Sequence, residues 1–91
     1  MTKRKPPADE VRVRLRAFIC GELLGDPSYT LQDDEPIISG GLIDSFYLAH
    51  LAVFIEDEFG VVIPDVDLTV ENFDTLDLMV LRIMEDLARR R

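Results

Sequence analysis

The stretch GGLIDSFYLAHLAVFIEDEFG, residues 40–60, decides the fold prediction because a long helical pattern follows its glycine pair. Five apolar residues of this stretch fall within about a third of a helical wheel: Leu48, Leu51, Ala52, Ile55 and Phe59. We therefore expect a helix that begins at Asp44 or Ser45, ends near Phe59–Gly60 and turns this apolar stripe toward a core. Gly60 suits the position just after a helix.

The opposite side of this expected helix is also apolar at its N-terminal end. Centred there are Phe46, His50, Val53 and Asp57, with Tyr47 and Phe54 on one flank and Ala49 and Glu56 on the other. An amphipathic surface helix would be polar on this side, so either the preceding loop or a partner protein covers it. We expect a partner, because the loop must also reach across from the first helix and can cover only part of this one.

Asp44 and Ser45 stand at the start of the expected helix. The carboxylate of Asp44 can accept a hydrogen bond from a free backbone N–H group and so cap the helix. The Ser45 hydroxyl would then lie in the first turn, where the helix dipole favours a phosphate by about 0.3 to 1 kcal/mol. Gly40 and Gly41 would let the loop backbone approach such a group closely. On chemistry alone, a serine in this position is more often a plain helix start than a site.

Three further helices are expected around this one. The first runs from about Ala8 to Leu24, and a brief one lies at about Thr69–Phe73. The last begins at a capping Asp74 and ends near Arg89. Their expected inward residues are Val11, Leu15, Phe18 and Ile19 in the first helix and Leu76, Val80, Ile83 and Leu87 in the last. The predicted fold is all-α, a small four-helix bundle of three longer helices plus a short third helix.

The connection between the first two long helices spans residues 25–43, which is long for a compact domain. Gly25 and Pro27 end the first helix. The connection contains several apolar residues that predict packing against the core rather than a solvated loop: Pro36, Ile37, Ile38, Leu42 and Ile43. Residues 60–63, GVVI, are the one short candidate for a strand.

The chain of 91 residues is long enough for one domain, which we assign to residues 8–91 after a disordered basic lead of residues 1–7. No apolar run approaches the roughly 18 to 20 residues of a membrane span, and the N-terminus lacks the apolar region of a secretory signal. The lone Cys20 fits a reducing cytoplasm, as a small core residue or, alternatively, a reactive thiol. His50 has no partner at metal-ligand spacing, so we expect no metal site.

The formal net charge of −8 is unevenly distributed. All ten basic residues lie near the ends of the chain: Lys3, Arg4, Lys5, Arg12, Arg14, Arg16, Arg82, Arg89, Arg90 and Arg91. Of the 18 acids, only Asp9, Glu10, Glu85 and Asp86 lie outside residues 17–81, which leaves that interval with a charge of −14. Such a surface disfavours nucleic acid and favours basic protein partners, although acids also serve simply to keep a small protein soluble.

The order of motifs resembles the acyl carrier protein superfamily, which includes peptidyl and aminoacyl carrier proteins. The resemblance rests on the Asp-Ser step in GGLIDSF, on EDEFGVVIP at residues 56–64 and on ENFDTLDLMVLRIMEDL at residues 71–87. It covers about residues 8–88. It implies that a phosphopantetheinyl transferase attaches 4′-phosphopantetheine from coenzyme A to Ser45. Asp44 matches the acidic residue beside the modified serine.

The resemblance further implies a non-enzymatic, monomeric, cytoplasmic carrier that holds an acyl or aminoacyl group as a thioester. Its partners would be an adenylating acyl- or aminoacyl-ligase or an acyltransferase, and then tailoring or condensing enzymes of a fatty-acid, polyketide, nonribosomal-peptide or related pathway. The family's recognition surface corresponds here to Phe46, Tyr47, His50, Val53, Glu56 and Asp57. Phe46 departs from the leucine usual in fatty-acid carriers, and the wording GLIDSF looks more like free-standing carriers paired with adenylating ligases.

No catalytic set is expected, because His50 lies five residues after Ser45 and about 140° around the same expected helix, where it cannot easily deprotonate the serine. The alternative function is an unmodified acidic helical module that docks basic partners. That reading explains the charge and the aromatic outer face equally well, but not the order in which Asp44 and Ser45 follow the glycine pair.

Overall fold

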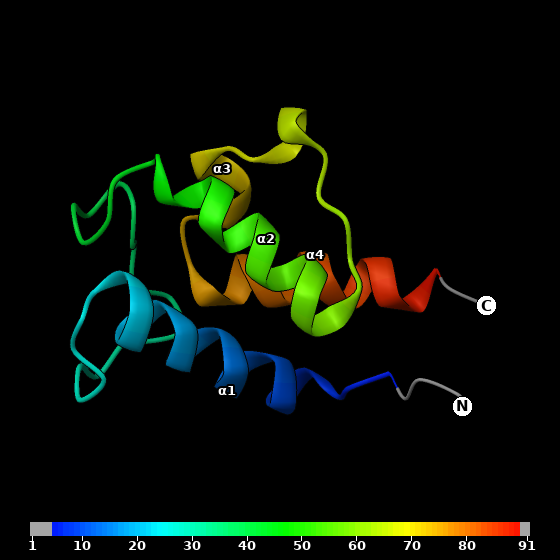
Figure 1. The fold of residues 1–91 in the computed structure, drawn as a ribbon, viewed down its shortest axis with the longest axis horizontal. Coiled ribbons are helices and arrows are strands. Elements are labelled where there is room, and N and C mark those ends of the chain that lie inside the picture. Colours follow the sequence, from blue (N-terminus) through cyan, green and yellow to red (C-terminus); the bar gives the residue numbers. More distant parts are fainter. Residues whose placement is uncertain (1–4, 90–91) are drawn as a thin grey trace.

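The computed structural model describes residues 5–89, and within that range its regular elements are all helical (Figure 1). They are α1 (Ala8–Phe18), α2 (Tyr47–Phe59), α3 (Val70–Phe73) and α4 (Leu76–Ala88). A π-helical turn, Ile19–Leu23, continues α1, and a short 3₁₀ turn, Asp65–Asp67, precedes α3. The predicted all-α class is confirmed, and residues 60–63 do not form a strand. The predictions for residues 1–4 and for Arg90 and Arg91 lie outside the described residues.

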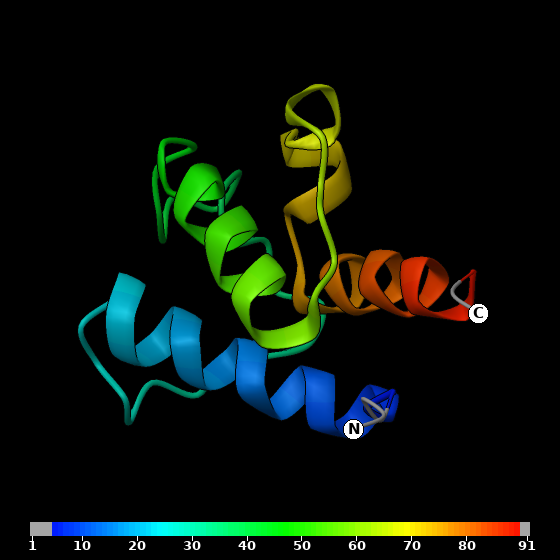
Figure 2. The same cartoon turned by 45° about the vertical axis from the view of Figure 1, so that its right-hand side comes forward.

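The arrangement matches a four-helix bundle only loosely. Helices α1 and α4 pack against each other, and α3, a single turn of four residues, packs on α4. In the view of Figure 1, helix α2 passes in front of α4 and lies above α1, and the start of α1 and the end of α4 lie toward the same side of the molecule (Figures 1 and 2). The contact of α2 with α1 is made by long side chains: the rings of Phe18 and Phe54 stack with centroids 4.2 Å apart, and Arg14 pairs with Glu58 at 2.9 Å.

The core consists of one cluster of buried apolar side chains drawn from α1, α2, α3, α4 and the connections between them. Every predicted inward residue of α4 is buried, as are Leu48, Leu51, Ile55 and Phe59 of α2. Ala52 is only half-buried. Phe54 was predicted on the outward flank, and this is wrong: its ring is half-buried against Phe18, because α1 lies along that side of α2.

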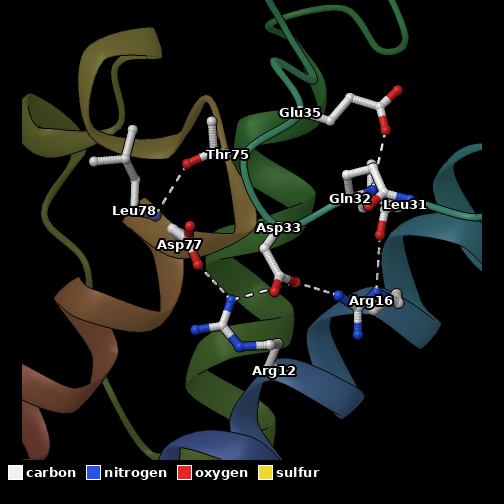
Figure 3. A network of polar contacts seen from close by, with 9 residues as sticks. All are labelled: Arg12, Arg16, Leu31, Gln32, Asp33, Glu35, Thr75, Asp77 and Leu78. Atoms are coloured by element: carbon white, nitrogen blue, oxygen red, sulfur yellow. Dashed lines mark hydrogen bonds and ion pairs between the residues drawn. The ribbon is translucent and has the colours of Figure 1, made fainter.

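The long connection between α1 and α2 packs against the core through the predicted Ile37 and Ile43 and also through Leu31. Ile38 and Leu42 are half-buried against the core, whereas Pro36, which was also predicted to pack, is exposed. A polar network fixes its middle (Figure 3). Arg16 donates to the carbonyl oxygen of Leu31 at 3.1 Å and pairs with Asp33, whose own carbonyl accepts from the Asp77 amide at 3.0 Å. Arg12 bridges the Asp77 carboxylate at 2.6 Å and that of Asp33 at 3.4 Å. The connection is therefore tied to both α1 and the start of α4.

The N-cap of α4 differs from the prediction. Thr75 adopts an extended conformation and its Oγ1 accepts from the Leu78 amide at 3.1 Å, which is the geometry of a cap. Asp74 has helical backbone angles at the end of α3 and does not cap α4. Its carboxylate instead accepts hydrogen bonds from Ile38 and Ser39. Thr69 caps α3 in the same way as Thr75 caps α4, by accepting from Asn72.

Replacing Leu51 or Ile55 with Ala should lower the free energy of unfolding by about 2 to 5 kcal/mol, because both side chains are fully buried between α2 and the rest of the core. Urea unfolding followed by circular dichroism measures this change. The matched control is Ala49→Gly on the exposed side of α2, which should cost only about 1 kcal/mol through helix propensity. Equal losses for the core variants and the control would contradict the assignment of the buried stripe.

Candidate functional site

The loop that precedes α2 forms a tight turn over residues 37–43. The carbonyl oxygen of Ile37 accepts from the amides of Leu42 and Ile43 at 2.9 and 3.1 Å, and Gly41 donates to Ile38 at 3.0 Å. The side chains of Ile37 and Ile43 are buried and anchor both ends of the turn in the core. Residues 44 and 45 therefore leave the turn from a fixed point.

Both glycines of the pair are required by this turn. A Cβ atom on Gly40 would lie 2.2 Å from the carbonyl oxygen of Pro36, which is an impossible approach. Gly41 has φ +85°, a conformation that side chains other than that of glycine rarely adopt. The backbone of the turn thus requires both glycines, whether or not a phosphate is bound nearby.

Asp74 fastens the turn from the junction between α3 and α4. Its Oδ1 accepts from the amides of Ile38 and Ser39 at 2.8 and 2.9 Å, and its Oδ2 accepts from the Ser39 hydroxyl at 2.6 Å. Its carbonyl oxygen accepts from the Ile37 amide at 2.7 Å. Burial alone would raise the pKa of the Asp74 carboxyl, but the hydrogen bonds from Ser39 and Ile38 outweigh it and hold that pKa below its usual value.

Ser45 is exposed in a single turn just before α2, and not within the helix as predicted. The Asp44 carboxylate accepts from the Phe46 amide at 3.0 Å, so it caps this turn. The Tyr47 and Leu48 amides donate to the carbonyl oxygens of Asp44 and Ser45, both at 3.0 Å. The amides of Phe46, Tyr47 and Leu48 thus already donate hydrogen bonds within the chain. A phosphate on Ser45 would therefore find fewer free N–H groups here than at an uncapped helix end.

A hollow of about 690 Å³ opens beside Ser45. Its apolar walls come from the π-helical turn, the 37–43 turn, α2 and α3: Leu23, Ile38, Leu42, Ile43, Tyr47 and Val70. Its polar rim includes Ser39, Asp44 and Ser45. Sequence reasoning missed Leu23 and Val70, because no local pattern indicates that residues so far apart in the chain face one hollow.

The outer face of α2 is open, so the preceding loop does not cover it. Phe46 is 84% exposed and Val53 is 59% exposed. Tyr47 and His50 are also exposed, with ring centroids 5.7 Å apart. The six predicted partner-binding residues are all exposed, but they do not share one side of the helix. Phe46, His50, Val53 and Asp57 lie on the outer face, whereas Tyr47 borders the hollow beside Ser45 and Glu56 lies on the opposite flank, toward residues 62–65. A second, smaller hollow of about 390 Å³ lies between this face and Phe18 of α1.

Some acids of the described range form ion pairs and others do not. The arginines of α1 and α4 pair with acids that the sequence places far away: Arg12 with Asp33 and Asp77, Arg14 with Glu58, Arg16 with Asp33, and Arg82 with Asp67. By contrast, Asp44, Glu56 and Asp57 make no ion pair within residues 5–89. The negative charge therefore stays uncompensated around the start and the outer face of α2.

No group of three or more His, Cys, Asp or Glu side chains in the described part of the chain is arranged to hold a metal ion. Cys20 is buried, and burial raises the pKa of its thiol. None of the helices between residues 5 and 89 combines the length and apolarity needed to cross a membrane. A scan against protein-family models and a comparison with curated proteins both gave no match.

Acid should weaken the Asp74 contacts. Because the pKa of this carboxyl is lower in the folded chain than its ordinary value of 3.8, its stabilising effect is present above that value and is lost as the pH falls through the folded pKa. In Asp74→Asn this titration is absent, so its free energy of unfolding should fall less steeply than that of the wild type from about pH 4 to about pH 2.

Urea unfolding at several pH values measures both slopes. The Glu35 carboxyl, whose pKa the hydroxyl of Tyr29 lowers, titrates in both proteins and cancels in the difference. Parallel curves for the wild type and Asp74→Asn would contradict the assigned hydrogen bonds.

Proposed function

We propose that this chain is a free-standing carrier protein of the acyl carrier type, modified on Ser45 with 4′-phosphopantetheine from coenzyme A. The observation that supports this most is the placement of Ser45: the residue is exposed, its backbone is fixed by the turns on either side, and it lies at the polar rim of a hollow that has apolar walls. The motif order that resembles carrier proteins points to the same residue.

The residues around Ser45 fit a covalent arm. The exposed hydroxyl is within reach of an incoming enzyme, and Asp44 lies beside it with a carboxylate that makes no ion pair within the described range. The open hollow next to the attachment point offers apolar side chains, among them Ile38, Leu42 and Tyr47, against which part of an arm or its cargo would pack. The arm would supply a thiol that holds an acyl or aminoacyl group as a thioester, while this chain supplies the fixed attachment point.

The outer face of α2 is the proposed docking surface for the transferase and for enzymes that load or consume the cargo. Its exposed apolar groups, Phe46 and Val53, are flanked by the unpaired acids Glu56 and Asp57. Partners with basic residues around an apolar patch would complement this surface. In this proposal the chain performs no catalysis itself, works in the cytoplasm as a monomer, and depends on adenylating ligases or acyltransferases for loading.

The second candidate function is an unmodified acidic interaction module. The same exposed face of α2 favours it, because that face needs no modification to bind a basic partner. The two functions differ in the fate of Ser45, so a single chemical test separates them.

Incubation of the full chain with coenzyme A and a broad-specificity phosphopantetheinyl transferase should add one phosphopantetheinyl group to the wild type and none to Ser45→Ala. Intact-mass spectrometry measures the gain. The matched control is Ser28→Ala, which removes another exposed loop hydroxyl, one bonded only to Asp26, and should be modified like the wild type. An unmodified wild type would exclude the carrier function, whereas a gain that survives in Ser45→Ala would exclude only the site.

Replacing Phe46 or Val53 with Asp should raise the KM of the transferase for this chain about tenfold, the effect of losing roughly 1.4 kcal/mol of binding. Helicity and thermal stability should change little, because both side chains are exposed. Leu81→Asp on α4 is the matched control, since Leu81 is 56% exposed and lies outside the proposed surface. A large loss of stability, or equal effects in all three variants, would argue against this docking surface.

A further inference from the structure

We propose that Asp74 is a positioning residue for the modification of Ser45: it holds the 37–43 turn, and through that turn fixes where the serine hydroxyl is presented. This inference rests on the proposed function of Ser45. Asp74 lies 29 positions beyond Ser45 in the chain, at the junction of α3 and α4, and does not contact the serine itself. Its effect would therefore pass through the residues that it binds.

The contacts of Asp74 with the turn are dense and directional. Four hydrogen bonds of 2.6 to 2.9 Å join this one residue to three consecutive residues, Ile37, Ile38 and Ser39. Both carboxylate oxygens and the carbonyl oxygen take part. Hydrogen bonds to an ionised acceptor are stronger than those between neutral groups, so the turn is held in one orientation relative to α3 and α4.

A continuous series of contacts leads from these residues to Ser45. Ile37, whose amide donates to Asp74, accepts from the amide of Ile43 at 3.1 Å. The next residue, Asp44, caps the following turn through the Phe46 amide, and Ser45 accepts from the amide of Leu48 in α2. The turn thus fixes one side of the serine and α2 fixes the other. A shift of the turn would displace Ser45 relative to the face of α2 on which an enzyme is proposed to dock.

The same contacts shape the hollow beside the serine. Ile38 and Ser39, which both bind the Asp74 carboxylate, line this hollow together with Val70 of α3. If the carboxylate were lost, one wall of the hollow and the serine at its rim would become mobile together. Transfer to the hydroxyl should then slow after docking, because group transfer is sensitive to displacements of about 1 Å.

The test is the kinetics of phosphopantetheine transfer to the full chain, with a broad-specificity transferase and coenzyme A. Asp74→Ala should lower kcat about tenfold and leave the KM for coenzyme A unchanged. Asp74→Asn should restore kcat to within about twofold of the wild type, since its amide oxygen can still accept from the two backbone amides. Ser39→Ala removes one of the four hydrogen bonds. Its kcat should therefore lie between that of the wild type and that of Asp74→Ala.

The matched control is Thr75→Ala, which removes the adjacent cap of α4, lowers the melting temperature, and leaves the Asp74 contacts in place. It should keep the wild-type kcat at a temperature where every variant is folded. Equal kcat values for Asp74→Ala and Thr75→Ala would overturn the inference, because loss of stability alone would then explain the effect.

Amide hydrogen exchange of Leu42 and Ile43 measures the order of the 37–43 turn without any modification of Ser45. Exchange at these two amides should accelerate in Ser39→Ala but not in Thr75→Ala, and this comparison decides the matter even if Asp74→Ala does not fold. Unchanged exchange in Ser39→Ala would overturn the inference. A wild type that gains no phosphopantetheine would overturn the proposed function, and with it the role in modification, whatever the exchange rates.

Discussion

The hydrogen bonds of one residue, Asp74, fix the loop before α2 against the junction between α3 and α4, and the position of Ser45 depends on this contact. The α3–α4 junction and the loop before α2 are distant in the chain and have no regular secondary structure in common. The Asp74 carboxylate joins them by accepting short hydrogen bonds from two backbone N–H groups and one hydroxyl group. Because the loop is fixed here, the start of α2 is fixed too. The exposed face of that helix therefore has a defined position relative to the turn at residues 37–43.

A second constraint is the separation of paired from unpaired charge. Arg12 and Arg16 of α1 pair with acids of the long connection and of the start of α4 (Figure 3). The positive charges of these two arginines are therefore balanced within the molecule. The pairs are partly exposed, so each adds little stability, but together they restrain a connection that has no helix of its own. Glu58 of α2 pairs with Arg14, whereas Asp44, Glu56 and Asp57 make no ion pair within the described residues, so negative charge remains beside the exposed Phe46 and Val53.

The sequence was sufficient to predict burial where apolar residues recur at the spacing of an α-helix. The repeats of Leu51 and Ile55 in α2 and of Val80 and Ile83 in α4 predicted their burial correctly, since a helix allows only one face to meet the core. It failed at Asp74 and Thr75, two adjacent residues that both suit a helix cap. The choice between them depends on the turn at residues 37–39, which no local pattern connects to the end of α3. For the same reason the shared hollow of Leu23 and Val70 could not be foreseen.

The sequence pointed to Ser45 as the candidate site, and the structure changes the physical argument for that proposal. The argument for a phosphate on Ser45 from the helix dipole weakens, because the amides of Phe46, Tyr47 and Leu48 already donate within the turn. The glycine pair likewise serves the turn. What favours Ser45 is instead its exposure at a fixed point, beside a hollow with apolar walls and near the unpaired carboxylate of Asp44. Recognition of the serine would then depend on docking of the whole α2 surface rather than on local attraction of phosphate to a helix end.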